Sequence, residues 1–173
     1  SANIHASVSG IVADVTKEYI DIKADEKQTE EYVPIQGDSI LELIKAAGIV
    51  GMGGAGFPTD VKLKKKLNDG IVILNAAECE PILSHNIYSI EKDPGRVYRG
   101  LLYAMEAIGA SKGIIAIKEK HKEAVKALKD VLDKENVGIH LLPDMYPMGE
   151  KRAVIREVLG ILLNVNQSSS EAN

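Results

Sequence analysis

A glycine-rich segment, residues 51–58, is the part of the sequence best suited to hold an anion. Four glycines within six positions leave the backbone open to a ligand and permit positive φ angles, so successive N–H groups can point at one phosphate. A helix expected from Pro58 onward would add its positive end, and Lys62 could face a phosphate or a reduced ring. The alternative to an anion site is that the glycines only permit a tight loop and that the lysines after it are solvated. The segment fits neither the dinucleotide fingerprint, which follows a strand, nor the Walker pattern.

A second polar segment, residues 75–81, follows an apolar run that predicts a buried strand. Ligands of open α/β sheets bind beyond the carboxyl ends of strands. Asn75 could bond the edge of a heterocycle, while Glu78 and Glu80 could bind ribose hydroxyls or set the charge beside a redox ring. The two carboxylates could also simply solvate a turn. Cys79 lies between two acids that disfavour its thiolate, so we predict a packing role for it.

A third segment, residues 146–152, precedes the last predicted helix. Gly149 loosens the start of that helix, whose N-terminus could meet the same ligand; by itself the segment is typical of an ordinary loop. The four histidines have no ligand spacing, so a zinc site is not expected. No Gly-x-Ser-x-Gly nucleophile elbow is present.

Alternating strands and helices must position these segments. Apolar runs predict strands at 71–74 and 113–117, and a third strand is predicted at 137–142. Helices are predicted at 94–108 from start and stop signals, at 121–134 from an amphipathic pattern, and at 150–159. This alternation predicts an α/β fold: a Rossmann-like layer with a mainly parallel sheet, which carries the glycine-rich loop.

The N-terminal part reads differently. Strands are predicted at 4–8, 11–15 and 19–23, a solvated loop at 24–36, and a short helix at 40–47 capped by Asp38 or Ser39. The helix after Pro58 is expected to carry Val61, Leu63 and Leu67. We therefore predict a small β module over 1–35, an α/β domain over 36–165, and a tail or the start of a further domain over 166–173.

Composition excludes several classes of protein. The formal net charge is −4 and Trp is absent, which weighs against a nucleic-acid binder. No apolar run approaches the ~18 residues of a membrane span. The single cysteine permits neither an internal disulfide nor an iron–sulfur cluster held by this chain alone.

Three segments together resemble a known family: GIVGMGGAGFPTDVKL (48–63), ILNAAECEPIL (73–83) and YPMGEKRAVIREVLG (146–160). They are similar to the flavin-binding core of RnfC-type electron-transport subunits and of the NADH-binding flavoprotein subunit of respiratory complex I. Residues 5–12 resemble the small β module of the RnfC branch. Clostridial proline-reductase-associated electron-transfer proteins share this layout.

The resemblance implies that the glycine-rich loop cradles the phosphate of FMN and that NADH stacks against the flavin. Hydride would then pass from nicotinamide to flavin, and electrons would leave singly to 4Fe-4S clusters in a downstream domain. It implies no catalytic side chain and no metal ligand in this chain. The implied cofactor-binding residues are Gly51, Gly53, Gly54, Ala55, Gly56, Phe57, Lys62, Asn75, Glu78, Glu80, Tyr146, Gly149 and Glu150.

Several positions depart from the complex I pattern and lean toward the RnfC branch. Met52 replaces an arginine, Ala77 an aspartate and Lys151 an acid, while Leu63 and Lys65 replace aromatics that clamp the NADH adenine. These changes weigh against adenine binding more than against FMN binding. The cysteine motifs of the family's cluster domain are absent, so we expect a fragment of an NADH dehydrogenase component.

The expected partners are subunits of a membrane Rnf-type complex or a soluble reductase, with no nucleic acid. The expected location is the cytoplasm, or the inner face of the cell membrane as a peripheral protein. Two alternatives stay open: a cofactor-free docking module of a reductase or electron-transport complex, and a different enzyme that uses the glycine loop for a nucleotide or a coenzyme A derivative.

Overall fold

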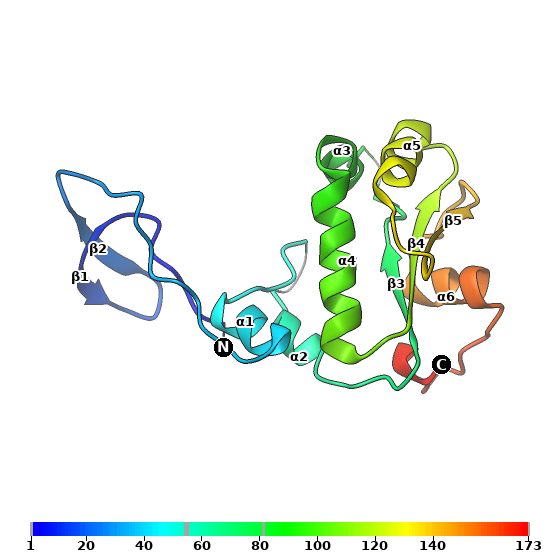
Figure 1. Ribbon diagram of the computed structural model, residues 1–173, viewed down its shortest axis with the longest axis horizontal. Coiled ribbons are helices and arrows are strands. Elements are labelled where there is room, and N and C mark those ends of the chain that lie inside the picture. Colours follow the sequence, from blue (N-terminus) through cyan, green and yellow to red (C-terminus); the bar gives the residue numbers. More distant parts are fainter. Residues whose placement is uncertain (1, 54–55, 81, 173) are drawn as a thin grey trace. The chain divides into compact units, whose positions relative to one another are not determined.

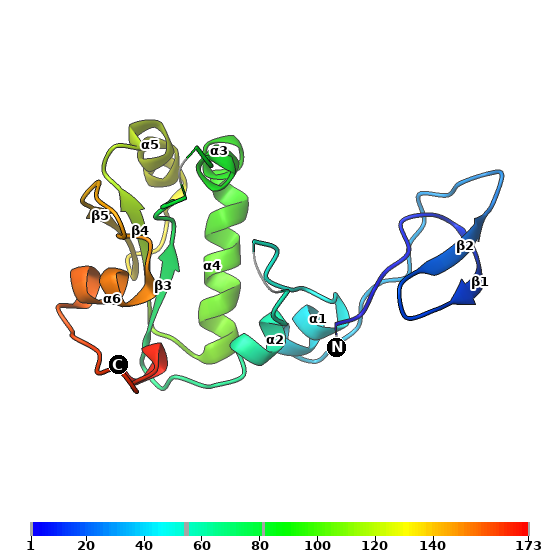
Figure 2. The same ribbon diagram turned by 180° about the vertical axis from the view of Figure 1, so that it is seen from behind.

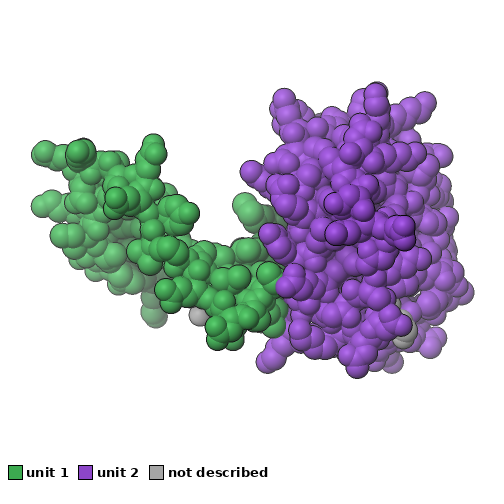
Figure 3. Space-filling view, viewed as in Figure 1, with its two compact units in different colours: residues 1–62 green, residues 63–173 purple. Residues whose placement is uncertain are grey.

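The computed structural model describes residues 2–53, 56–80 and 82–172. The chain divides into two compact units, residues 1–62 and residues 63–173 (Figure 3). The predicted domain boundaries, after residue 35 and after residue 165, stay a prediction.

The first unit contains an antiparallel hairpin of β1 (Gly10–Val15) and β2 (Ile20–Ala24). The strands predicted at 11–15 and 19–23 are thus confirmed, each to within a residue. The strand predicted at 4–8 was wrong. The Asn3 side chain donates to Ala46 O at 3.1 Å, and the His5 ring nitrogen lies 2.9 Å from the same oxygen. This segment therefore bonds to the end of a helix instead of joining a ladder.

The two helices of the first unit are short: α1 (Ile40–Ala46) and α2 (Thr59–Lys62). Ser39 caps α1, because its hydroxyl accepts from Glu42 N at 3.2 Å, as one of the two predicted caps. The helix after Pro58 is shorter than predicted. Beyond α2 the backbone makes a hydrogen bond outside the helix, since Leu67 N donates to Ile108 O at 2.7 Å.

The second unit is built on a parallel sheet in the order β3 (Ile71–Asn75), β4 (Lys112–Lys118) and β5 (Val137–Leu142). The register places Asn75 opposite Ala116 and Lys118 opposite Leu142. This confirms the predicted α/β fold with a mainly parallel sheet. All three strands end at the same edge, which is where ligands bind in such sheets.

Helices cover both faces of the sheet (Figures 1 and 2). Ile115 and Ile117 of β4 pack into one core cluster with α3 (His85–Lys92), α4 (Pro94–Ile108) and α5 (Lys122–Val131). Ala116 faces the other way, into a cluster with α6 (Lys151–Leu159). The alternation along β4 explains why a continuous apolar run was required there. A 3-10 turn, η1 (Ser169–Glu171), follows α6.

Local signals set the bounds of α4. Asp93 accepts from Arg96 N at 2.9 Å, Pro94 occupies the first turn, and Gly109 ends the helix with φ of 74°. By contrast, α3 was not predicted. Its N-cap, Ser84, is a residue type that favours helix starts but makes no capping side-chain bond among the described residues. Within the described part of the chain, no helix is long and apolar enough to cross a membrane.

Candidate functional site

The carboxyl edge of the sheet brings the second and third polar segments together. Asn75, the last residue of β3, donates from Nδ2 to Gly149 O at 2.9 Å. Its Oδ1 accepts from Ala77 N at 3.1 Å. One amide side chain therefore holds two loops that lie far apart in the sequence, and both loops carry predicted site residues.

Gly149 permits this contact because it has no side chain. A Cβ at this position would meet Ala77 O and would lie 2.7 Å from Cys79 Sγ. A real Cβ does not tolerate such distances, so the two loops could not approach as closely with any other residue. Cys79 is half-buried against this glycine, in keeping with the predicted packing role.

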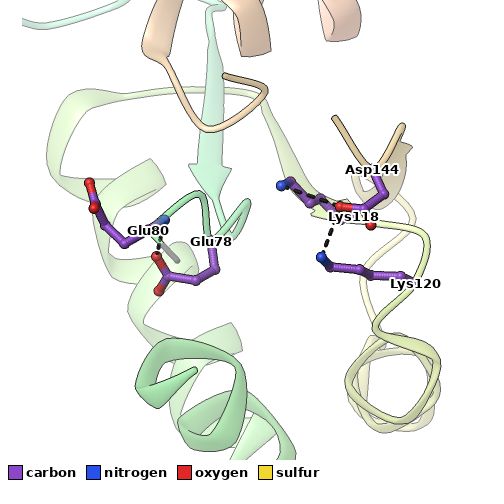
Figure 4. Close-up of polar contacts among 5 residues, drawn as sticks. All are labelled: Glu78, Glu80, Lys118, Lys120 and Asp144. Carbon is purple, nitrogen blue, oxygen red and sulfur yellow. Dashed lines mark hydrogen bonds and ion pairs between the residues drawn. The ribbon is translucent and has the colours of Figure 1, made fainter. Parts of the chain in front are cut away.

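Glu78 is held ionised at the end of β3. Its Oε1 accepts from Glu80 N at 3.2 Å, and its Oε2 accepts from Asn86 Nδ2 of α3 at 2.9 Å. Burial by itself raises the pKa of Glu78, but these hydrogen bonds outweigh it and bring the pKa below its ordinary value. Glu80 is exposed, so the edge offers one carboxylate held by hydrogen bonds and one that faces solvent (Figure 4).

The third segment is anchored by a residue that sequence reasoning passed over. Met148 is 2% exposed and packs in the cluster with α6. Around it, Tyr146 is exposed and precedes a cis peptide bond to Pro147. Glu150 caps α6, since its Oε2 accepts from Arg152 N at 2.7 Å and Ala153 N at 3.1 Å. The anchor thus fixes the loop while the tyrosine ring stays available.

The glycine-rich loop belongs to the first unit and is closed at its base. Gly51 N donates to Phe57 O at 2.9 Å, and Thr59 N donates to Ile49 O at 3.0 Å. Gly56 has φ of 64°, a conformation that favours glycine. An added Cβ at Gly53 or Gly56 would meet nothing within 4 Å, so the backbone of the loop is open to a ligand.

Two of the remaining residues predicted for this loop can be placed. Phe57 and Lys62 are exposed in the first unit. Gly54 and Ala55 lie outside the described residues. The structure therefore brings Asn75, Glu78, Glu80, Tyr146, Gly149 and Glu150 to one edge of the second unit, and places Gly51, Gly53, Gly56, Phe57 and Lys62 in or beside the loop of the first unit.

A basic cluster at the end of β4 was missed altogether. Asp144 Oδ1 lies 2.9 Å from Lys120 Nζ and 3.5 Å from Lys118 Nζ (Figure 4). The hydrogen bond from Lys120 is the main reason that the pKa of Asp144 lies below its ordinary value. The signal was present in the sequence. Lys118 follows the second buried strand, just as Asn75 follows the first, and the same rule on strand ends applies to both.

Comparisons with known proteins point to one family. A family model described as the Nuo51 FMN-binding domain matches residues 44–172. The cobalamin reductase PduS of Salmonella typhimurium is 44% identical over 117 residues, which cover 68% of this chain and 25% of that protein. A component of the proton-translocating ferredoxin:NAD(+) oxidoreductase complex of Clostridium ljungdahlii is 32% identical over 181 aligned positions, which cover 92% of this chain and 39% of that protein.

A solved structure agrees with these relatives. The NAD+-reducing NiFe hydrogenase in its air-oxidized state matches with a TM-score of 0.62 and 29% identity, over 70% of this chain and 23% of that chain. This chain thus spans only 25% and 39% of the two curated relatives named above. The matched residues include all three segments on which the resemblance was based, and the chain belongs to the family described as the Nuo51 FMN-binding domain.

Proposed function

We propose that this chain binds FMN and is the flavin-bearing part of an electron-transfer subunit that oxidises NADH. The observation that carries the proposal is the hydrogen bond from Asn75 to Gly149, which joins two of the three family segments at the ligand-binding edge of a parallel sheet. The family match, and relatives whose names include NAD(+), support it.

The residues present fit the phosphate and ring of FMN. At Gly53 and Gly56 the space that a Cβ would take is empty, so a phosphate could approach the backbone there, and Lys62 is an exposed cation of the same unit. In the second unit, Asn75 would bond the ring edge, and Glu78 and Glu80 would line the flavin and nicotinamide side. Tyr146, Gly149 and Glu150, at the same edge of the second unit, are the remaining residues that we propose contact FMN. Gly54 and Ala55 complete the proposed loop.

When bound, FMN supplies the ability to take a hydride and to release electrons one at a time. The chain's own residues bind and orient it. Glu78 stays ionised at neutral pH because two hydrogen bonds stabilise its charge, so it can accept from ribose or amide donors but holds no proton to give. We propose that 4Fe-4S clusters outside these residues receive the electrons.

The relatives suggest two settings for this chain. One relative is a component of an ion-translocating complex, and another is a cobalamin reductase. We propose that the chain works within a larger assembly of one of these kinds, including the reductases expected from the proline-reductase branch. We propose the cytoplasm, or its membrane face, as the location.

The visible spectrum of the purified chain tests the proposal. After FMN is added and the excess removed, we expect flavin bands that stay with the protein and bleach with NADH under anaerobic conditions. Gly53→Val should abolish flavin retention, because its side chain would fill the open approach to the loop. Met52→Ala, in the same loop and 95% exposed, is the matched control and should retain flavin.

A wild-type chain that retains no flavin would overturn the proposal. The docking-module alternative would then lead. It has an observation of its own, since Ile11 and Val15 of β1 are 72% and 64% exposed and could contact a partner. A preference for ATP or coenzyme A over FMN would instead favour the third class of function.

A further inference from the structure

A buried lysine ends the central strand of the sheet. Lys118 is 5% exposed, which is unusual for an ammonium group unless it is paired. The partner that the structure gives it is Asp144, at 3.5 Å. Charge-assisted hydrogen bonds are nearer 2.7–2.9 Å, so the pairing is loose. The proposed FMN and ring contacts do not use this lysine.

The cluster around Lys118 carries more positive than negative charge. Lys120 Nζ lies 2.9 Å from the same Asp144 oxygen, so two ammonium groups share one carboxylate. The Asp144 and Lys120 side chains are 44% and 49% exposed, whereas that of Lys118 is 6% exposed. Asp144 is therefore accessible to solvent, whereas Lys118 is buried. A second anion could take the position that Asp144 leaves.

The start of α5 adds positive potential beside these lysines. His121 N donates to Lys118 O at 3.1 Å, and this turn sets the first residues of α5 against the end of β4. The His121 side chain makes no capping bond among the described residues. The first turn also carries one carboxylate, Glu123, which opposes the positive potential, whereas its N–H groups and the dipole of this ten-residue helix act in the same sense as the lysines.

The neighbouring strand end has the opposite charge. Glu78 and Glu80 follow β3, which pairs with β4 so that Asn75 lies opposite Ala116, two positions before Lys118. Figure 4 shows these glutamates on one side of the edge, and Lys118, Lys120 and Asp144 on the other. Carboxylates bind ribose hydroxyls, and cations bind phosphate oxygens. A dinucleotide presents both groups in sequence.

We infer that Lys118, Lys120 and the start of α5 bind the diphosphate group of the dinucleotide substrate, and that Asp144 occupies this site when the substrate is absent. The inference rests on the proposed function, because it names the part of the substrate that this edge holds. It also gives the chain a means to hold a dinucleotide without the aromatic clamp for adenine.

Calorimetric titration with adenosine diphosphate ribose tests the inference on the chain without flavin. This probe carries the diphosphate but no nicotinamide. We expect Lys118→Met and Lys120→Gln each to weaken binding roughly tenfold, as the loss of a charged hydrogen bond does. Asp144→Asn should tighten binding several-fold, because it removes the competing carboxylate. Lys129→Gln, on the exposed side of α5, is the matched control and should leave the affinity unchanged.

Asp144→Asn is expected to raise the affinity for the probe, whereas the lysine variants lower it. This difference distinguishes a binding role of the cluster from a purely structural one. If Asp144→Asn weakens binding as the lysine variants do, the cluster only holds the loop in place and the inference is wrong. If Lys118→Met does not fold, the exposed Lys120→Gln carries the test. Equal affinity for inorganic pyrophosphate and adenosine diphosphate ribose would also overturn the assignment to a dinucleotide.

Failure of the inference and failure of the proposed function can be told apart. The titration needs no flavin, so the expected pattern in a chain that retains no FMN would support the inference and contradict the proposed function. Flavin retention together with unchanged affinities in the lysine variants would support the proposed function and contradict the inference. No binding of the probe by the wild-type chain at low salt would overturn the inference.

Discussion

At the scale of single residues, Gly149 decides whether the two loops at the sheet edge can meet. We expect Gly149→Ala to lower the free energy of unfolding by about 1–3 kcal/mol, because the new Cβ would be forced against Cys79 Sγ and Ala77 O. Urea denaturation measures this loss. Flavin affinity should fall as well, because the bond from Asn75 to Gly149 would be displaced.

Gly138→Ala is the matched control for that substitution. Gly138 lies in β5, and an added Cβ there would meet nothing within 4 Å. The free energy of unfolding of the Gly138→Ala variant should not decrease. If both alanine variants were equally stable, the close approach of the two loops would not be needed for folding.

His121 predicts a dependence of stability on pH. Its Nε2 is buried and has no hydrogen-bond partner in the described chain. Burial, and then Lys120 and Lys118, lower its pKa, while Asp144 and Glu91 oppose this effect. The unfolded chain therefore binds the proton more readily than the folded chain. The contribution of neutral His121 to the free energy of unfolding should therefore be greatest above about pH 6.5. It should decrease as the pH falls below this value.

The variant His121→Asn checks this origin. It should flatten the dependence of stability on pH between about 7.5 and 5.5, since asparagine does not titrate. Urea midpoints measured at several pH values give the slope. An unchanged slope in the variant would assign the pH dependence to other groups.

At the scale of elements, α4 contains a glycine that its packing does not require. Gly100 lies inside α4, and an added Cβ would meet nothing within 4 Å. We expect Gly100→Ala to stabilise the protein by about 0.5–1 kcal/mol, because alanine loses less backbone freedom when the helix forms. Thermal or urea unfolding measures the gain.

Gly113→Ala provides the contrast on the inner side of α4. Gly113 lies in β4, and its added Cβ would be 2.7 Å from Met105 Sδ. The substitution should therefore destabilise the protein by forcing the helix and strand apart. A stabilising effect at this position would mean that the contact between α4 and β4 is looser than the structure shows.

At the scale of the whole molecule, burial is concentrated in the second unit. Both core clusters lie within residues 63–173. Among the described residues of 1–62, none is classed as buried. We expect residues 63–173, produced alone, to unfold cooperatively in urea, whereas residues 1–62 alone should show no cooperative transition. Circular dichroism during denaturation measures both. An unfolded 63–173 fragment would mean that its core depends on the first unit.

Local signals explain why much of this fold could be predicted. The continuous apolar runs of β3 and β4 indicate strands covered on both faces, and Asp93, Pro94 and Gly109 mark the ends of α4. Each of these signals acts through neighbours in the chain. The N-cap of α3, Ser84, makes no capping side-chain bond among the described residues, and the turn after α2 depends on a bond from Leu67 to Ile108, which no local pattern encodes.

The sequence by itself determined the fold class, most element bounds and the family, because these depend on periodicity, caps and contiguous motifs. Only the tertiary structure decided which polar groups meet. Asn75 reaches Gly149, and Lys118 reaches Asp144, because parallel strands in register bring their carboxyl ends to one edge. Register is a property of strand pairing across the sheet, so contacts that depend on it become visible only once the chain is folded.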